Sequence, residues 1–150
     1  MTEMQTIAPV TRSVLARCSP ELAFEVFTRE TATWWPLETH ALHPGEVAEV
    51  VWEERLGGEV YEISTNGERS HWATITAWDP PSRLAFAWHV NPEAPAPTDV
   101  EITFTPEGGG TRIELEHRGW ERLGADAEQT RANYDEGWEL VLGRYLAKLG

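Results

Sequence analysis

Apolar and polar residues alternate along most of the chain between residues 47 and 118. Near the end of this stretch, Val100, Ile102 and Phe104 alternate with the polar Glu101 and Thr103. Because successive side chains of a strand point to opposite faces, the pattern predicts a sheet with one apolar face. We expect strands at residues 7–17, 47–54, 59–65, 68–78, 83–90, 100–105 and 111–118.

Short turns separate the predicted strands. Asn66-Gly67 is the clearest, because both central residues of a tight hairpin turn need a positive φ. Pro80 and Gly109 lie in two further turns. Connections this short join antiparallel neighbours, so the strands from residue 47 onward are expected to form a six-strand meander.

Two short helical segments follow the first strand. Ser19 precedes Pro20, a pairing that favours a helix capped by the serine hydroxyl, here over residues 20–29. A second short helical turn is expected at residues 33–36, where Pro36 ends it.

One long amphipathic helix is predicted at residues 126–149. Asp126 is the expected N-cap, with Gln129 as its capping-box partner. Gly137 and Gly143 each cost about 1 kcal/mol in a helix relative to alanine. Close approach to the sheet, or room for a ligand, would explain that cost. The apolar stripe consists of Tyr134, Trp138, Val141, Leu142, Tyr145 and Leu149.

These elements predict an α+β fold in one domain, 1–150, with a core at about residues 7–149. A twisted sheet must be covered on its apolar face, and the last helix is the element long enough to do so. A curved sheet gripping one helix leaves a space between them, so this architecture favours a cavity.

The order of strand, two short helices, six strands and long helix resembles the helix-grip fold of the START-like superfamily, often called SRPBCC. Four motifs resemble those of the heat-shock-protein ATPase activator homologue family. They are Leu56–Glu62, Trp78–Leu84, Gly110–Trp120 and Tyr134–Trp138. The resemblance implies a curved antiparallel sheet of about seven strands wrapped on the last helix. It also implies a cavity for an apolar small molecule. The N-terminal domain that accompanies this one in the eukaryotic chaperone activator is not expected here.

Our first hypothesis is that the protein binds an apolar or aromatic small molecule between sheet and helix, without catalysis or a cofactor. Eight tryptophans supply rings, each able to bury roughly 200 Å². Candidate ligand-binding residues are Trp35, Trp52, Tyr61, His71, Trp88, Phe104, His117, Tyr134 and Trp138. Core packing is the alternative for each ring. Trp35 or Trp52 is expected at the mouth, and His117 and Tyr134 are expected to orient a polar group.

The second hypothesis is an enzyme, because some relatives in the superfamily are cyclases, dehydratases or hydrolases. The alternation leaves open which face of residues 59–65 and 68–78 points inward. If Glu62 lies inside, it needs a partner, and a pair with His117 or His71 is the acid–base arrangement available.

Metal and disulfide chemistry find little support. His40 and His43 offer metal ligands, but their spacing fits no zinc motif, so no metal is expected. Cys18 is the single cysteine, which excludes an intrachain disulfide and suits a reducing cytoplasm.

Acidic residues outnumber basic ones by 25 to 12, giving a net charge of −13. Nucleic acid and anionic membranes are therefore poor partners. The first six residues show no signal peptide, and no apolar run reaches the ~18 residues of a membrane helix. We expect a cytoplasmic protein. A chaperone bound through the acidic surface is the third hypothesis, and a homodimer stays open.

Overall fold

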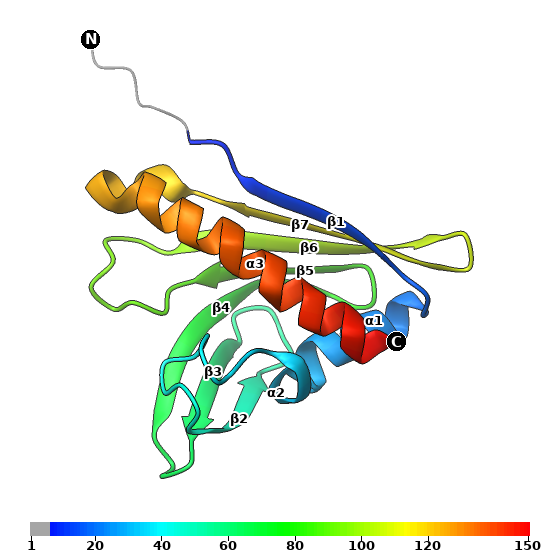
Figure 1. Ribbon diagram of the computed structural model, residues 1–150, viewed down its shortest axis with the longest axis horizontal. Helices are drawn as coiled ribbons and strands as arrows, with labels where there is room; N and C mark the ends of the chain where they lie inside the picture. Colours follow the sequence, from blue (N-terminus) through cyan, green and yellow to red (C-terminus); the bar gives the residue numbers. More distant parts are fainter. Residues whose placement is uncertain (1–6) are drawn as a thin grey trace.

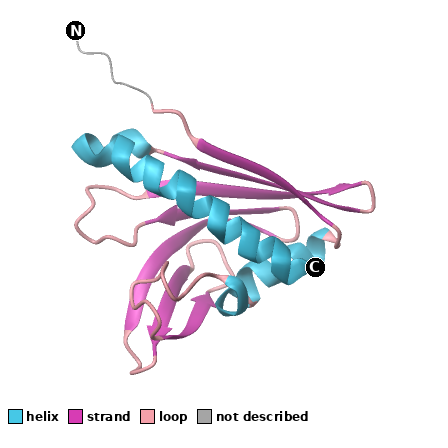
Figure 2. Ribbon diagram, viewed as in Figure 1, coloured by secondary structure: helices cyan, strands magenta, loops and turns pink. Residues whose placement is uncertain are grey.

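The computed structural model describes residues 7–150, which form seven antiparallel strands and three α-helices in one layered arrangement (Figures 1 and 2). The sheet order is β1-β7-β6-β5-β4-β3-β2. The strands are β1 (Val10–Ala16), β2 (Val47–Trp52), β3 (Glu59–Ser64), β4 (Arg69–Asp79), β5 (Arg83–Trp88), β6 (Thr98–Glu107) and β7 (Gly110–Arg118). The helices are α1 (Pro20–Arg29), α2 (Thr31–Trp34), the 3₁₀ helix η1 (Trp120–Asp126) and α3 (Ala127–Leu149).

The sheet curls around α3, which crosses its concave face diagonally (Figure 1). Register shifts between Val60 and Tyr61 and between Ile75 and Ala77 mark irregularities in the β3–β4 and β4–β5 pairings. Bulges of this kind bend a strand and increase its twist, which turns β2–β4 away from the plane of the other strands. The result is the helix-grip fold that the element order predicts.

The apolar stripe of α3 packs on the sheet as expected, and its buried residues include Val141 and Leu142. Near the C-terminal end, Tyr145 Oη donates a hydrogen bond to the Ala23 carbonyl oxygen of α1 (2.5 Å). The same tyrosine packs edge-on against Phe27, with 5.3 Å between ring centroids. The core is therefore solid where α1 and α2 meet α3.

Local capping agrees with the prediction at one helix and differs at another. The Leu22 amide donates to Ser19 Oγ (3.2 Å), so the cap of α1 is confirmed. The capping box at Asp126 is wrong, because Asp126 makes no side-chain cap and Gln129 bonds to Asn133 instead. The unpredicted η1 runs directly into α3, so the chain approaches Asp126 already coiled.

Two sequence expectations concern the chain as a whole. Within residues 7–150, no helix is both long and apolar enough to cross a membrane. The first six residues, to which the expectation about a signal peptide refers, lie outside the described part of the chain.

Candidate functional site: an aromatic pocket under the long helix

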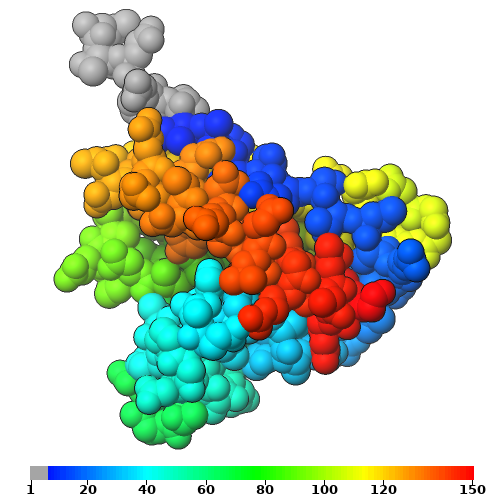
Figure 3. Space-filling view, viewed as in Figure 1, coloured from blue at the N-terminus to red at the C-terminus, as the bar shows by residue number. Residues whose placement is uncertain are grey.

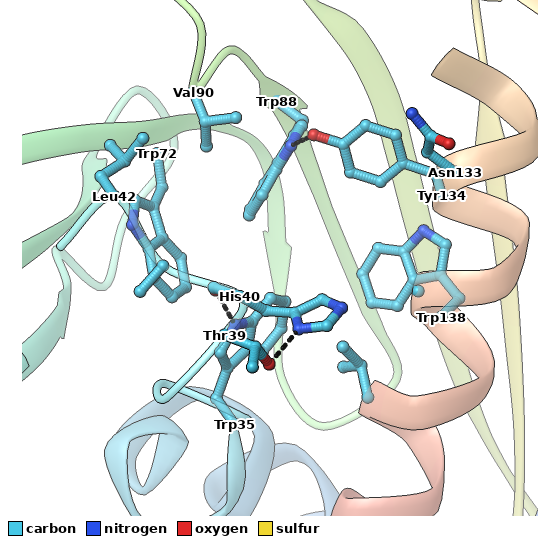
Figure 4. A pocket seen from close by; sticks show the side chains of 13 residues that line it. Trp35, Thr39, His40, Leu42, Trp72, Trp88, Val90, Asn133, Tyr134 and Trp138 are labelled. Carbon is cyan, nitrogen blue, oxygen red and sulfur yellow. Dashed lines mark hydrogen bonds between the residues drawn. The ribbon is translucent and has the colours of Figure 1, made fainter. Parts of the chain in front are cut away.

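A pocket of about 360 Å³ lies between α3, the segment that follows α2, and strands β4 and β5 (Figure 4). It is lined by Trp35, Thr39, His40, Ala41, Leu42, Trp72, Trp88, Val90, Asn133, Tyr134, Gly137, Trp138 and Val141. Figure 3 shows the segment after α2, in cyan, lying beside α3, in orange. The pocket therefore has one wall of helix, one of sheet and one of irregular chain.

Four indole rings dominate these walls. Trp35 lies 5.1 Å from Trp72 and 6.0 Å from Trp138, measured between ring centroids. Trp88 lies 5.6 Å from Trp72 and 6.1 Å from Trp35. Tilted and edge-on contacts at these distances are favourable aromatic geometries, so the rings support one another.

Each of the four indole N–H groups already donates a hydrogen bond inside the protein. The acceptors are the His40 carbonyl oxygen for Trp35 (2.7 Å), Glu62 Oε1 for Trp72 (2.8 Å), Tyr134 Oη for Trp88 (2.7 Å) and His117 Nδ1 for Trp138 (3.0 Å). An indole has no other polar hydrogen. The four rings therefore offer only carbon faces to the pocket, in fixed orientations.

The Tyr134 hydroxyl is one of the polar groups on the pocket wall. Its oxygen accepts the bond from Trp88, which leaves its own hydrogen free to donate. Burial raises the pKa of Tyr134 above its ordinary 10.0, although the bond from Trp88 opposes the rise. The hydroxyl therefore stays protonated at neutral pH and can act as a hydrogen-bond donor.

His117, predicted as a ligand contact, lies behind the wall of this pocket and does not line it. Its side chain is fully buried, and burial lowers its pKa from 6.5 to about 3. Because Trp138 can only donate, Nδ1 carries a lone pair and the proton sits on Nε2, which donates to Thr98 Oγ1 (2.7 Å). Its ring also packs on Trp120, 4.2 Å away. His117 therefore fixes the Trp138 ring.

Tyr61 and His71, which were also predicted to bind the ligand, lie on the outer face of the sheet and do not line this pocket. The bulge opposite Tyr61 gives β4 one extra residue, which lets Trp72 point inward while His71 points outward. On the outer face of the sheet, Cζ of Arg69 lies 3.6 Å from the Tyr61 ring centroid, and His71 Nδ1 lies 2.9 Å from Glu59 Oε2.

Trp52 and Phe104 face inward, but they belong to the packed core and do not line the pocket. Trp52 contacts Phe27 and Phe86, with ring centroids 6.1 and 5.3 Å apart. Phe104 contacts Phe24 at 5.3 Å. Trp52, which was expected at the mouth as the alternative to Trp35, lies where α1 covers the sheet. Trp35, Trp88, Tyr134 and Trp138 are the candidates that the structure brings together at the pocket.

Glu62 is inside and fully buried, but neither predicted histidine partner reaches it. Its Oε1 accepts from the Leu42 amide (2.7 Å) and from Trp72. Its Oε2 accepts from the His43 amide and lies 3.0 Å from His43 Nδ1. The expected pairs with His117 and His71 are therefore wrong.

The two loop histidines have separate roles. His40 lines the pocket and His43 bridges two carboxylates, since its Nε2 lies 3.1 Å from Glu68 Oε2. Among residues 7–150, no three His, Cys, Asp or Glu side chains come together as metal ligands would.

Several lining residues were not predicted from the sequence. They are Thr39, His40, Ala41, Leu42, Trp72, Val90, Asn133, Gly137 and Val141. Of these residues, Gly137 could have been found from the sequence, because a glycine inside a helix is unfavourable. A Cβ at Gly137 would meet only the His40 ring, at 3.8 Å, so the missing side chain leaves room in the pocket. Gly143 has no atom within 4 Å of such a Cβ, so close packing explains neither glycine.

Residues 17–150 of the chain match the protein family described as Activator of Hsp90 ATPase homolog 1-like protein. No curated protein matches the chain.

Solved structures agree with the fold. Txn09, an anthrahydroquino-γ-pyrone synthase complexed with SUM, is 32% identical, with coverage of 95% of this chain and 97% of that one and a TM-score of 0.65. CalC, a self-sacrificing resistance protein from Micromonospora echinospora, is 25% identical over 95% and 94% of the two chains, with a TM-score of 0.69. CalU16 from the same organism is 21% identical over 97% and 80%, with a TM-score of 0.65, and supports the fold alone.

Proposed function

We propose, on the premise that this chain belongs to the family of Activator of Hsp90 ATPase homolog 1-like proteins, that it binds a flat, oxygenated aromatic small molecule under α3. The observation that carries the proposal is the set of four indole rings whose N–H groups are all satisfied inside the protein. Such walls present apolar faces to a ligand and little else, which suits a flat ring system.

The size of the pocket fits this ligand class. Its volume of about 360 Å³ falls within the range of small-molecule sites, roughly 300–1,000 Å³. The 32% identical Txn09 is named for a product that joins an aromatic ring system to a pyrone, which supports an aromatic, oxygen-bearing ligand here.

Tyr134 supplies the orientation. A ligand carbonyl oxygen beside Tyr134 would accept the hydroxyl hydrogen that Trp88 leaves free. In a mostly apolar pocket, one such bond discriminates between ligands with and without an oxygen at that edge.

The test compares two dyes by quenching of tryptophan fluorescence: 1-hydroxyanthraquinone, which has carbonyl oxygens, and anthracene, which has none. Tyr134→Phe also removes the acceptor of the Trp88 N–H, which affects both dyes. We therefore expect this substitution to weaken binding of the quinone about tenfold more than binding of anthracene, the equivalent of about 1.4 kcal/mol. Tyr61→Phe is the matched control, because Tyr61 lies on the outer face. No binding of either dye to the wild type would refute the proposal.

A second candidate is an enzyme acting on the same class of ligand, because the 32% identical relative is a synthase. Tyr134 on α3 and His40 on the opposite segment both line the pocket and carry transferable protons (Figure 4). Conversion of a bound polyketide-like substrate that is lost in both Tyr134→Phe and His40→Gln would support catalysis. Binding without conversion would favour the first candidate.

A chaperone partner, the third hypothesis, stays a prediction. Retention of a heat-shock chaperone on the immobilised protein at low salt, released at high salt, would support an interaction through the acidic surface. The absence of retention at low salt would count against it.

A further inference from the structure

The segment between α2 and β2 forms one wall of the pocket without regular secondary structure. Thr39, His40, Ala41 and Leu42 line the cavity from this segment. A wall of this kind must be held in place by specific contacts. The Leu42 and His43 amides both donate to the carboxylate of Glu62, at 2.7 and 3.0 Å.

The same carboxylate also holds the wall contributed by the sheet. Glu62 Oε1 accepts from Trp72 Nε1 at 2.8 Å as well as from the Leu42 amide. One side chain, which itself does not line the pocket, therefore ties the irregular segment and an indole ring to strand β3.

Burying the Glu62 carboxylate costs free energy, because a charged group loses its hydration. Glu62 has no exposed surface, and no Lys or Arg of the described residues lies within ion-pair distance of it. A buried carboxylate is tolerated only when hydrogen bonds replace its water. Four donors do so here, and all of them come from pocket-forming pieces: the Leu42 and His43 amides, the His43 ring and Trp72.

We propose that Glu62 is a positioning residue: its buried charge closes the 37–46 segment onto the sheet and aligns Trp72, so ligand affinity depends on a side chain that never touches the ligand. The proposal rests on the proposed function for the identity of the pocket, but the closing role can be measured in the free protein.

His43 makes the arrangement sensitive to pH. Its two ring nitrogens face the carboxylates of Glu62 on β3 and Glu68 in the following turn, which are the charged groups in contact with it. The hydrogen bond to Glu62, and then the charge of Glu68, raise the pKa of His43 above 6.5. The doubly protonated ring satisfies both carboxylates. Its contribution is therefore complete below about pH 6.5 and is lost as the pH rises through the raised pKa.

Glu62→Gln tests the charge at constant shape. Each carboxylate oxygen faces two donors, so whichever way the amide turns, its NH₂ group meets donors and their bonds are lost. We expect amide exchange at Leu42 and His43 to accelerate about tenfold or more, and 1-hydroxyanthraquinone to bind about tenfold more weakly. Exchange at Ile102, in the sheet centre, is expected to stay slow.

Glu59→Gln is the matched control, because Glu59 lies on the outer face of the same strand and bonds to Arg69 and His71. It should change neither loop exchange nor dye affinity. Unchanged loop exchange in Glu62→Gln would overturn the closing role, and faster exchange with unchanged affinity would overturn the coupling to the pocket. A wild type that binds no dye refutes the proposed function instead, and loop exchange alone then judges Glu62.

His43→Gln keeps both amide bonds to Glu62, so it tests the proposal even if Glu62→Gln fails to fold. Wild-type dye affinity should fall as the pH rises from 6 through the raised pKa of His43, and His43→Gln should abolish that fall. His71→Gln, which removes the histidine of the outer pair, should retain it. His40 also lines the pocket, so a fall that persists in His43→Gln would assign the pH dependence elsewhere and refute the role of His43.

Discussion

Stability at mildly acidic pH should depend on one buried imidazole, His117. The perturbation is His117→Gln, whose amide can still accept from Trp138 and donate to Thr98 but does not titrate. In the wild type, a proton on Nδ1 would break the bond from Trp138 and place a charge where no water reaches. This is why burial lowers the pKa of His117 to about 3.

The magnitude follows from the difference between folded and unfolded chains. In the unfolded chain, His117 titrates near 6.5, so at pH 5.5 it is about 90% protonated, whereas in the folded protein it is still neutral. Lowering the pH from 7.5 to 5.5 therefore costs the wild type about 1.4 kcal/mol of unfolding free energy through this residue. The sign is fixed by the lowered pKa: stability is lost as the pH falls below 6.5.

Urea unfolding followed by tryptophan fluorescence measures this free energy at both pH values, which stay above the isoelectric point of about 4.7. When the pH is lowered from 7.5 to 5.5, the free energy of unfolding should fall by about 1.4 kcal/mol more in the wild type than in His117→Gln. Contributions from His43, which have the opposite sign, are common to both proteins and cancel. An equal change in the two proteins would refute the neutral, buried state of His117.

The remaining predictions concern glycines and a helix cap. Gly137→Leu should fill the pocket and abolish dye binding, whereas Gly143→Leu, on the exposed face of α3, should leave binding intact; both should raise the melting temperature through about 1 kcal/mol of helix propensity. Ser19→Ala should destabilise the fold by about 1 kcal/mol in urea unfolding, because the α1 cap is lost. Gly58→Ala should cost about 2 kcal/mol or more by the same measurement, since its Cβ would collide with the Glu53 carbonyl oxygen, and a loss below about 0.5 kcal/mol would contradict this packing.

The fold was predictable because local sequence patterns, such as alternation along strands and helix caps, indicate its elements and their order. The alternation at Val100, Ile102 and Phe104 places all three inside the sheet, as predicted. The predicted bounds of the first helix, 20–29, are those of α1, because Ser19 and the proline after it fix its start. The 3₁₀ helix η1 was missed because its sequence carries no helical periodicity, and Trp120 anchors it by packing on His117 at the end of β7.

The inward face of β3 and β4 could not be predicted, because a bulge changes the relation between sequence parity and face. On the C-terminal side of the bulge, Ala73 and Ile75 point inward at alternate positions. One residue earlier, Trp72 also points inward, and His71 then points outward. An inserted residue reverses the face of everything beyond it, and alternating small and large residues do not mark where the insertion occurs.

The irregular wall of the pocket could not be predicted from the sequence for a different reason. The position of Leu42 and His43 is set by Glu62, about twenty residues away in sequence, and no periodicity records a contact of that kind.

The hydrogen bonds that hold the pocket walls also affect ligand binding. With Trp72 and the other indoles already hydrogen-bonded behind the pocket surface, a ligand orders few side chains on entry, and less of its binding energy is spent on ordering. Selectivity then rests on ring shape and on polar groups of the wall such as the Tyr134 hydroxyl. A substitution that loosens the bonds behind the rings, as at Glu62, should therefore weaken all flat ligands together. Loss of the Tyr134 hydroxyl, which also holds Trp88, should weaken ligands with an oxygen at that edge more than those without one.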